Sequence, residues 1–304
     1  MKEPRNVLLT GGTGFIGERL IRALQARGQG VSLLTRRVRA REDRTVGQFY
    51  WDFQTPAPPE PLEWADTIIH LAGEPVAQRW TDEVKRRIRD SRILGTARLV
   101  EGVAKLPAKR RPVALISASA IGFYGDTGEE PRSETAPSGQ GFLPDVCVGW
   151  ERAADQARDL GLRVAKIRIG IVLGREGGAL AKMLPPFRLG LGGILGDGRQ
   201  WMSWIHADDL VSLFIYAAEN DSVEGPLNGT APNPVRNREF TAALAGALGR
   251  PALIPTPAVA LRLLFGEMAE VLLASQRILP DATIRSGFQF RYPNLGPALQ
   301  HLLA

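Results

Sequence analysis

The stretch TGGTGFIG, residues 10–17, decides the fold that this sequence predicts. A short apolar run at residues 7–9 precedes it, and apolar residues at helical spacing follow it over residues 16–26. Glycines three apart between a buried strand and a helix are typical of a dinucleotide-binding loop, because they allow a tight turn, a close approach to a pyrophosphate and close helix packing. The free N–H groups that begin the helix would bind the phosphates. We therefore expect cofactor contacts from Gly11, Thr13, Gly14, Phe15, Ile16 and Gly17.

The end of the second expected strand, residues 31–34, indicates which dinucleotide is bound. Dinucleotide loops that prefer NAD(H) usually place an acidic residue about 20 positions on, to hold the ribose 2′-hydroxyl. Here the strand is followed by Thr35, Arg36 and Arg37, with no carboxylate. A guanidinium group pairs with a phosphate in a two-pronged geometry, so these residues favour the 2′-phosphate of NADP(H). Arg36 is the preferred candidate, and the alternative for Arg37 is a side chain that simply faces solvent.

The order of patterns along the chain predicts the fold class. Apolar runs at residues 67–71, 114–117 and 164–171 alternate with helical patterns at 83–103 and 146–159. This alternation favours an α/β fold with a Rossmann-type doubly wound parallel sheet, and we assign residues 1–173 to this NADP(H)-binding domain. After Gly174 the sequence becomes glycine-rich and irregular. We assign residues 174–304 to a smaller mixed C-terminal substrate or capping lobe, partly interleaved with the sheet.

Composition limits the partners. The 304 residues are 44% hydrophobic and 23% charged, which is ordinary for a soluble globular protein. The net charge of +6 arises partly from clusters at residues 36–44, 85–92 and 105–111, and a solvated helix face explains the second cluster better than nucleic acid does. No apolar run approaches the length of a membrane span. One cysteine excludes an internal disulfide, and three scattered histidines form no spaced metal motif. We expect a cytoplasmic protein with a small-molecule substrate, and no nucleic acid, membrane or metal.

Several motifs together resemble the extended short-chain dehydrogenase/reductase superfamily, which contains nucleotide-sugar epimerases and dehydratases. After the glycine loop, His70-Leu71-Ala72-Gly73 resembles the cofactor-lining segment behind the fourth strand. The segment from Ser117 to Ala120, followed by Tyr124-Gly125-Asp126, resembles the serine-bearing fifth strand and its loop. The resemblance implies that Leu71, Ala72, Gly73 and Ser117 line the cofactor. It also implies a homodimer formed through two helices beside the sheet.

A narrower resemblance covers nearly the whole chain. The segments RWTDEVKRRIRDSRILGT, SWIHADDL, NGTAPNPVRNREF and GFQFRYP are similar to an epimerase-family, nucleoside-diphosphate-sugar epimerase-like subfamily with its own C-terminal extension. In the superfamily, a helix after the fifth strand carries Tyr-x-x-x-Lys, which exchanges a proton with the substrate and holds the nicotinamide ribose. Here Trp150 and Ala154 stand in those positions. An indole N–H cannot act as a base and alanine offers no polar group, so the usual mechanism does not transfer.

Four other residues are candidates for the missing chemistry. Ser119 matches the substrate-binding serine, and Tyr124 supplies a phenol that is either catalytic or, as we favour, structural or in contact with substrate. Glu151 could transfer protons if it turned inward, whereas most helix glutamates are solvated. Cys147 is expected to be a small buried hydrophobe. His206 is a proton shuttle or a helix-start residue that supports the lobe.

Two functions remain open at this point. The first is an NADP(H)-dependent oxidoreductase or epimerase-like enzyme, in which Arg188, Arg199 and Gln200 would suit an anionic or sugar-like substrate. Trp201 and Trp204 would then form a flat wall, or alternatively pack the lobes together. The second is a catalytically silent NADP(H)-binding sensor or regulatory protein, which the Trp150 and Ala154 replacements favour. The preserved polar residues favour the enzyme.

Overall fold

A single parallel sheet organises the molecule. The computed structural model describes residues 5–38 and 45–304, so residues 39–44 of the first basic cluster lie outside the described residues. Seven strands lie in the order β10-β6-β5-β4-β1-β2-β3, and every neighbouring pair is parallel. The strands are β1 (Asn6–Thr10), β2 (Gly30–Thr35), β3 (Gly47–Tyr50), β4 (Thr67–His70), β5 (Ala114–Ala120), β6 (Arg163–Ile169) and β10 (Gly225–Gly229). The order reverses at β1, which is the topological switch point where doubly wound sheets bind ligands.

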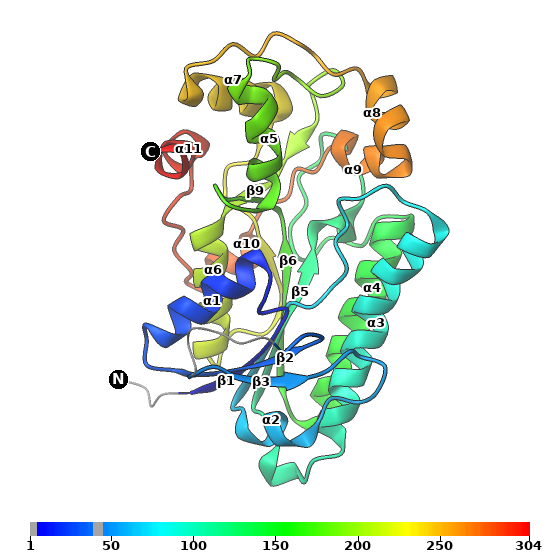
Figure 1. Cartoon of the computed structure of the whole chain (residues 1–304), viewed down its shortest axis with the longest axis vertical. Helices are drawn as coiled ribbons and strands as arrows, with labels where there is room; N and C mark the ends of the chain where they lie inside the picture. The colour runs from blue at the N-terminus through cyan, green and yellow to red at the C-terminus, as the bar shows by residue number, and fades with distance from the viewer. Residues whose placement is uncertain (1–4, 39–44) are drawn as a thin grey trace.

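Helices cover both faces of this sheet (Figure 1). One face carries α1 (Phe15–Gln25) and α6 (Ala207–Glu219). The other carries α2 (Pro59–Trp64), α3 (Asp82–Ala104) and α4 (Phe142–Asp155). Both faces of the central strands are therefore buried, which is why those strands are continuous apolar runs.

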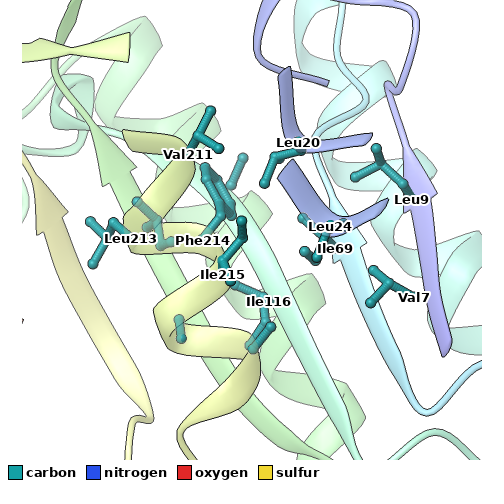
Figure 2. Packing of buried hydrophobic residues seen from close by; sticks show 14 of the residues in the cluster. Val7, Leu9, Leu20, Leu24, Ile69, Ile116, Val211, Leu213, Phe214 and Ile215 are labelled. Carbon is teal, nitrogen blue, oxygen red and sulfur yellow. The ribbon is translucent and has the colours of Figure 1, made fainter. Parts of the chain in front are cut away.

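The core on the α1 and α6 side is built from interlocking aliphatic side chains. Leu20 and Leu24 of α1 and Phe214 of α6 meet side chains from β1, β4 and β5, as Figure 2 shows. Each of these three residues is completely buried. Burial of one such side chain stabilises the fold by about 1.5–3 kcal/mol. This packing holds the start of α1 against the carboxyl end of β1, where the glycine loop lies.

The C-terminal half supplies a smaller lobe and also returns to the sheet. Its short strands are β7 (Ile171–Leu173), β8 (Trp201–Met202), β9 (Trp204–His206) and β11 (Val235–Arg236), with β8 and β11 antiparallel. Its helices are α5 (Gly178–Arg188), α7 (Asn237–Leu248), α8 (Ala258–Phe265), α9 (Ala269–Leu273), α10 (Asp281–Arg285) and α11 (Leu295–Leu303). In the part of the chain that is described, no helix is long and apolar enough to cross a membrane.

The α/β fold with a doubly wound parallel sheet and a smaller mixed C-terminal lobe is confirmed. The strand expected over residues 164–171 divides at Gly170 into β6 and β7. At Gly170 the backbone passes so close to Ser203 that a Cβ would press on its carbonyl oxygen. The helix expected over 146–159 begins earlier, at Phe142, and ends in a 3₁₀ turn, Gln156–Leu160. The domain division at residue 173 stays a prediction.

Candidate functional site

The glycine loop is packed tightly on one side and open on the other. Gly11 has φ +71°, and a Cβ there would lie 2.8 Å from the carbonyl carbon of Leu71. A Cβ at Gly17 would collide with the carbonyl oxygen of Gly11, so the start of α1 requires glycine there. A Cβ at Gly14 would meet only the same oxygen, at 3.3 Å, and both Thr13 and Gly14 are exposed. The open side thus consists of backbone at the N-terminus of α1, where N–H groups attract anions.

A buried chain of three polar side chains, Thr10, His70 and Thr96, holds this loop in place. The Thr10 hydroxyl accepts from the backbone N–H groups of Leu71 and Ala72 at 3.2 and 3.1 Å, so its proton points to Nδ1 of His70, 2.7 Å away. Nε2 of His70 then donates to the Thr96 hydroxyl at 2.9 Å. Burial lowers the pKa of His70 to about 4, so the imidazole is neutral and suited to this donor–acceptor role.

The expected cofactor residues surround this platform. Phe15 lies under the loop at residues 174–177, where a Cβ on Gly174 or Gly177 would strike its ring. Ile16 is half-buried and packs against the α1-side core. Ser117 is buried and donates to the carbonyl oxygen of Ala118 at 3.0 Å.

Arg36 and Arg37 extend from the end of β2 into solvent. Within residues 5–38 and 45–304, neither guanidinium group forms an ion pair or a side-chain hydrogen bond. Two unpaired cations therefore stand beside the open glycine loop. These groups fit a dinucleotide that carries an additional phosphate, because each donor set is complementary to phosphate oxygens.

The helix that should carry the acid/base pair is sealed against the core. Trp150 is 4% exposed, and its indole Nε1 has no hydrogen-bond partner among the described residues. Ala154 is fully buried against Leu115 and other aliphatic side chains on the α3 and α4 side. A lysine side chain has no room at that position.

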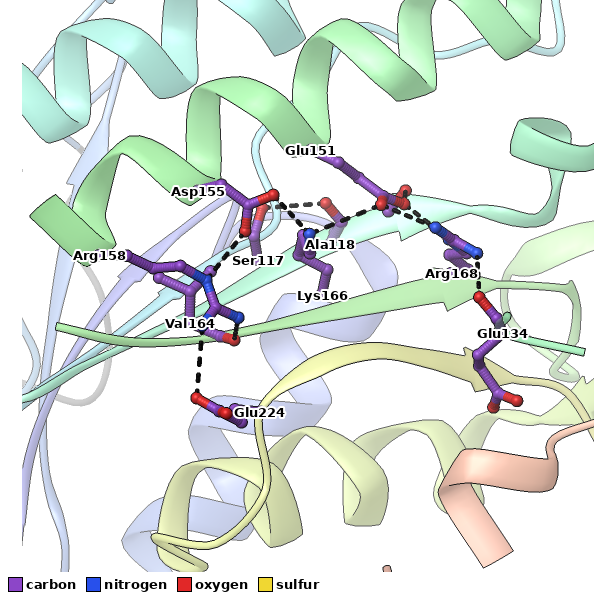
Figure 3. Close-up of polar contacts among 11 residues, drawn as sticks. Ser117, Ala118, Glu134, Glu151, Asp155, Arg158, Val164, Lys166, Arg168 and Glu224 are labelled. Carbon is purple, nitrogen blue, oxygen red and sulfur yellow. Dashed lines mark hydrogen bonds and ion pairs between the residues drawn. The ribbon is translucent and has the colours of Figure 1, made fainter. Parts of the chain in front are cut away.

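Glu151 turns inward and forms a buried ionic cluster with Arg168 of β6. Nε and Nη2 of Arg168 donate to the two carboxylate oxygens of Glu151 at 2.8 and 2.9 Å, as Figure 3 shows between α4 and the sheet. The Ser119 hydroxyl donates to Oε1 of Glu151 at 2.7 Å. Ser119 and Arg168 are register partners on β5 and β6, so both face α4. Of the two alternatives for Glu151, the structure therefore supports the inward one. We call Ser119, Tyr124, Glu151 and Arg168 the Glu151 cluster.

Tyr124 is locked into the same cluster. Its hydroxyl donates to Oδ1 of Asn228 and accepts from Nη1 of Arg168, both at 2.8 Å. Burial raises the pKa of Tyr124 to about 12, so the phenol stays protonated at neutral pH. Because both hydrogen-bonding roles are occupied, the geometry favours the structural alternative over a catalytic one.

The sequence did not single out Arg168 as a site residue, nor its neighbours Lys166 and Glu134, which border the cluster. Arg168 and Lys166 alternate with isoleucines on β6, and Lys166 pairs with Asp155 at 2.6 Å. Glu134 accepts from the backbone N–H groups of Asn228 and Ala282, both at 2.9 Å, and thereby ties the C-terminal extension to the sheet edge. Charged residues at alternate positions of a buried strand were the available signal, since such charges require partners.

His206 supports the lobe, as the second of its two alternatives expected. It begins α6, and its Nδ1 accepts from the backbone N–H of Asp208 at 3.0 Å. Its ring stacks on Tyr292 at 3.9 Å, and its Nε2 lies 3.1 Å from Nδ1 of His301. Ligand atoms of His206, Asp208 and His301 lie within 4.8 Å of one another, but Asp208 already pairs with Arg19 at 3.0 Å.

The lobe tryptophans and the cysteine have separate environments. Trp204 is completely buried in the lobe core, so it packs rather than forming an open wall. Trp201 lies between the guanidinium groups of Arg236 and Arg277, 4.6 and 4.7 Å from its ring centroid. Cys147 is buried, and burial raises the pKa of its thiol to about 12, which agrees with an inert hydrophobic role.

The remaining polar candidates of the lobe differ in exposure. Gln200 is buried, and its amide donates to the carbonyl oxygen of Leu195 at 3.0 Å. Arg188 and Arg199 are exposed. Of these three side chains, those of Arg188 and Arg199 are therefore accessible to a ligand.

Comparison with known proteins identifies the family. Residues 7–228 match the model of the NAD dependent epimerase/dehydratase family. The chain belongs to this family, whose fold is the NAD(P)-binding Rossmann type. Residues 256–302 match a further domain of unknown function, DUF1731, which corresponds to the expected C-terminal extension. Both levels of the resemblance are thus confirmed.

Several relatives are similar over most of their length. The chain is 42% identical to the chloroplastic epimerase family protein SDR39U1 homolog of Arabidopsis thaliana, over 98% of this chain and 86% of that protein. It is 38% identical to the epimerase family protein YfhF of Bacillus subtilis, over 98% of both chains. The crystal structure of human epimerase family protein SDR39U1 with NADPH superposes with a TM-score of 0.87, at 35% identity, over 98% of this chain and 99% of that one.

Proposed function

We propose that this protein binds NADP(H) and transfers hydride between the nicotinamide and a small anionic or sugar-like molecule. The observation that carries the proposal is the pair of unpaired guanidinium groups, Arg36 and Arg37, at the end of β2 beside the open glycine loop. A carboxylate at that point would repel a 2′-phosphate, whereas a guanidinium group binds it. The NADPH complex of the similar human protein supports the same choice.

The nicotinamide would supply the hydride chemistry, and this chain would supply binding and proton transfer. Gly11, Gly14 and Gly17 would hold the pyrophosphate, and Leu71, Ala72 and Gly73 would line the cofactor from the end of β4. We assign proton handling to Ser119 and Glu151. A proton taken by Ser119 from a substrate hydroxyl passes to Glu151, because the Ser119 hydroxyl already donates to that carboxylate at 2.7 Å.

The surroundings of Glu151 support this assignment. Arg168 fixes the position of the carboxylate through two hydrogen bonds, so that it stays within reach of the Ser119 hydroxyl. An open hollow of about 390 Å³ reaches Glu151 and Arg168 beside Ser138 and Arg152, so the proton has a route to solvent. Tyr124 acts as a positioning residue for Arg168 in this scheme.

A catalytically silent NADP(H) sensor is the second candidate. The specific observation in its favour is the sealed surface of α4, where Trp150 and Ala154 are buried in place of the usual acid/base pair. The homodimer through two helices beside the sheet, here α3 and α4, stays a prediction and would suit either function.

Calorimetric titration of nucleotide-free protein with NADPH, NADP⁺ and NADH tests the proposal. We expect tight NADPH binding, and Arg36→Asp should weaken it about 10–150-fold more than NADH binding, the range set by one charged hydrogen-bonded pair. Arg37→Asp shows which arginine dominates, and Arg250→Asp at the end of α7 is the matched charge control. Equal losses for both nucleotides with Arg36→Asp overturn the NADP(H) assignment.

A turnover screen then separates the two candidates. The NADPH-loaded protein is incubated with carbonyl compounds, and the NADP⁺-loaded protein with alcohols and sugar nucleotides, while nicotinamide absorbance is followed. Turnover that Ser119→Ala abolishes, with NADPH affinity unchanged, supports the enzyme. Tight binding without turnover on any substrate class supports the sensor.

A further inference from the structure

Arg92 lies at the carboxyl end of the sheet, on the face opposite to α1. Arg92 belongs to α3, one turn before Thr96, whose hydroxyl bonds His70 at the end of β4. Its guanidinium group therefore lies beyond the end of that strand. A Cβ on Gly73 would sit 3.1 Å from Cζ of Arg92, so the group touches the expected cofactor-lining segment.

The guanidinium group of Arg92 also covers an aromatic ring. Its Cζ lies 5.1 Å from the ring centroid of Trp150, the residue that replaces the usual tyrosine. The indole Nε1 of Trp150 is buried without a partner among the described residues. A cation therefore lies over the residue that stands in the position of the usual tyrosine.

Arg92 has hydrogen-bonding capacity that the protein does not use. Its Nη1 donates to the carbonyl oxygens of Glu74 and Ile88, at 3.0 and 3.1 Å. Three of its five N–H donors, on Nε and Nη2, have no acceptor in the part of the chain that the structure describes. The Glu74 carboxylate lies near Arg87 instead, at 3.7 Å, and no described carboxylate is within ion-pair distance of Arg92.

The free donors of Arg92 are within reach of a ligand. Arg92 is half-buried, and its Nε and Nη2 are not among the buried atoms that lack a partner, so they are open to the outside. Burial lowers the pKa of Arg92, and a nearby anion would therefore stabilise its charged form. Arg168, a buried arginine near α4, already has its carboxylate partner in Glu151. The contrast indicates that the counter-ion of Arg92 comes from outside the chain.

We propose that Arg92, stacked on Trp150, binds the anionic group of the substrate, a carboxylate or a phosphate. The proposal rests on the proposed function and names its substrate class. The cofactor pyrophosphate is assigned to the N-terminus of α1 on the other face of the sheet, so it does not supply this anion. The planar fork of Nε and Nη2 matches two oxygens of one anion, and the Trp150 ring lies against the guanidinium group at 5.1 Å.

The signal of the Trp150 indole tests the site directly. Protein with ¹⁵N-labelled tryptophan shows indole signals from six tryptophans, and Trp150→Phe identifies the one that matters. Acetate and inorganic phosphate are titrated separately into cofactor-free and NADPH-loaded protein. We expect a saturable shift of the Trp150 signal, and the tighter probe shows whether the site prefers a carboxylate or a phosphate.

Two variants of α3 provide the comparison. Arg92→Gln should weaken probe binding at least about tenfold, as expected for loss of a charge-assisted pair. Arg86→Gln removes the same charge from an exposed position of the same helix and should leave binding unchanged. Arg92→Lys retains the charge without the fork, and it should bind the probes with intermediate affinity, which also covers the case that Arg92→Gln does not fold.

Three results would overturn the proposal. The first is no saturable shift with either probe, and the second is a shift that Arg92→Gln leaves unchanged. The third is competition between the probe and NADPH, together with a loss of NADPH affinity in Arg92→Gln. That result would assign the anion at Arg92 to the cofactor. If NADPH does not bind at all but the Arg92-dependent shift persists, the proposed function fails and the anion site stands.

Discussion

Two buried polar clusters lie at the carboxyl ends of the strands, and they differ in charge and in origin. The chain Thr10–His70–Thr96 is neutral and joins β1, β4 and α3 beside the glycine loop. The Glu151 cluster is ionic and joins α4, β5, β6 and the turn that holds Tyr124. The neutral chain holds a binding platform without any net charge. In the ionic cluster, the ion pair of Glu151 and Arg168 lies on the helix that usually carries the catalytic pair. Each charge of this pair is buried and is stabilised by the other.

Breaking the ion pair should have the largest effect. Arg168→Met leaves the buried Glu151 carboxylate with only the longer ion pair to Lys166, at 3.8 Å, and should cost about 3–5 kcal/mol of unfolding free energy. The measurement is equilibrium urea unfolding of the variant beside the wild type. Adding Glu151→Leu removes the stranded charge and should recover most of the loss. If the double variant is no more stable than Arg168→Met, the cluster is not governed by charge pairing.

The neutral cluster should make the unfolding free energy depend on pH. Burial lowers the pKa of His70 from 6.5 to about 4, so the unfolded chain binds a proton in that interval and the folded protein does not. Stability is therefore complete above pH about 6.5 and falls as the pH drops to about 4, by about 3 kcal/mol from this group. Burial lowers the pKa of His206 to about 4 as well, which adds loss in the same direction.

The variant His70→Gln isolates the contribution of His70 to this pH dependence. The difference in unfolding free energy between wild type and His70→Gln should shrink as the pH falls from 6.5 to 4, because the glutamine does not titrate. Urea unfolding at a series of pH values measures this difference. A constant difference across the interval would contradict the neutral assignment of His70.

Deleting one hydroxyl from each cluster should give the smallest changes in unfolding free energy, and the two variants are closely matched. Thr10→Val strands the His70 nitrogen and the Ala72 N–H, and should cost about 1–3 kcal/mol. Ser119→Ala removes one donor from a carboxylate that keeps both bonds from Arg168, and should cost about 0.5–1.5 kcal/mol. Thermal and urea unfolding of both variants supply the values. A larger loss for Ser119→Ala would reverse the ranking of the two sites.

Local patterns predicted the strand, glycine loop and helix at the start of the fold. The apolar run, the glycine spacing and the arginines after β2 lie within residues 7–37, and each depends on neighbours in the chain. The cofactor contacts expected of these residues and of Leu71 and Ala72 stay predictions, and the packing of Leu71 and Ala72 against Gly11 became visible only in the structure. The strand β3 and helix α2 were not predicted, because each is short and carries little periodicity.

The ionic cluster could be predicted only in part. Ser119, Tyr124 and Glu151 were named as single candidates, but nothing in their spacing showed that one arginine bonds both Glu151 and Tyr124 beside Ser119. Arg168 is 17 residues from Glu151 and 44 from Tyr124, and the register of β5 against β6 is what brings it beside Ser119. Arg92 was likewise one of several arginines in a basic helix until its burial distinguished it from Arg86.

By itself, the sequence determined the parallel α/β class, the glycine loop after the first strand and the loss of the tyrosine–lysine pair, because each depends on residue types at short, fixed spacing. Only the tertiary structure decided which charged side chains are buried and which have partners in the described part of the chain. Those properties depend on strand register and helix packing over long separations, and they distinguish Arg168, which is paired within the chain, from Arg92, which is not.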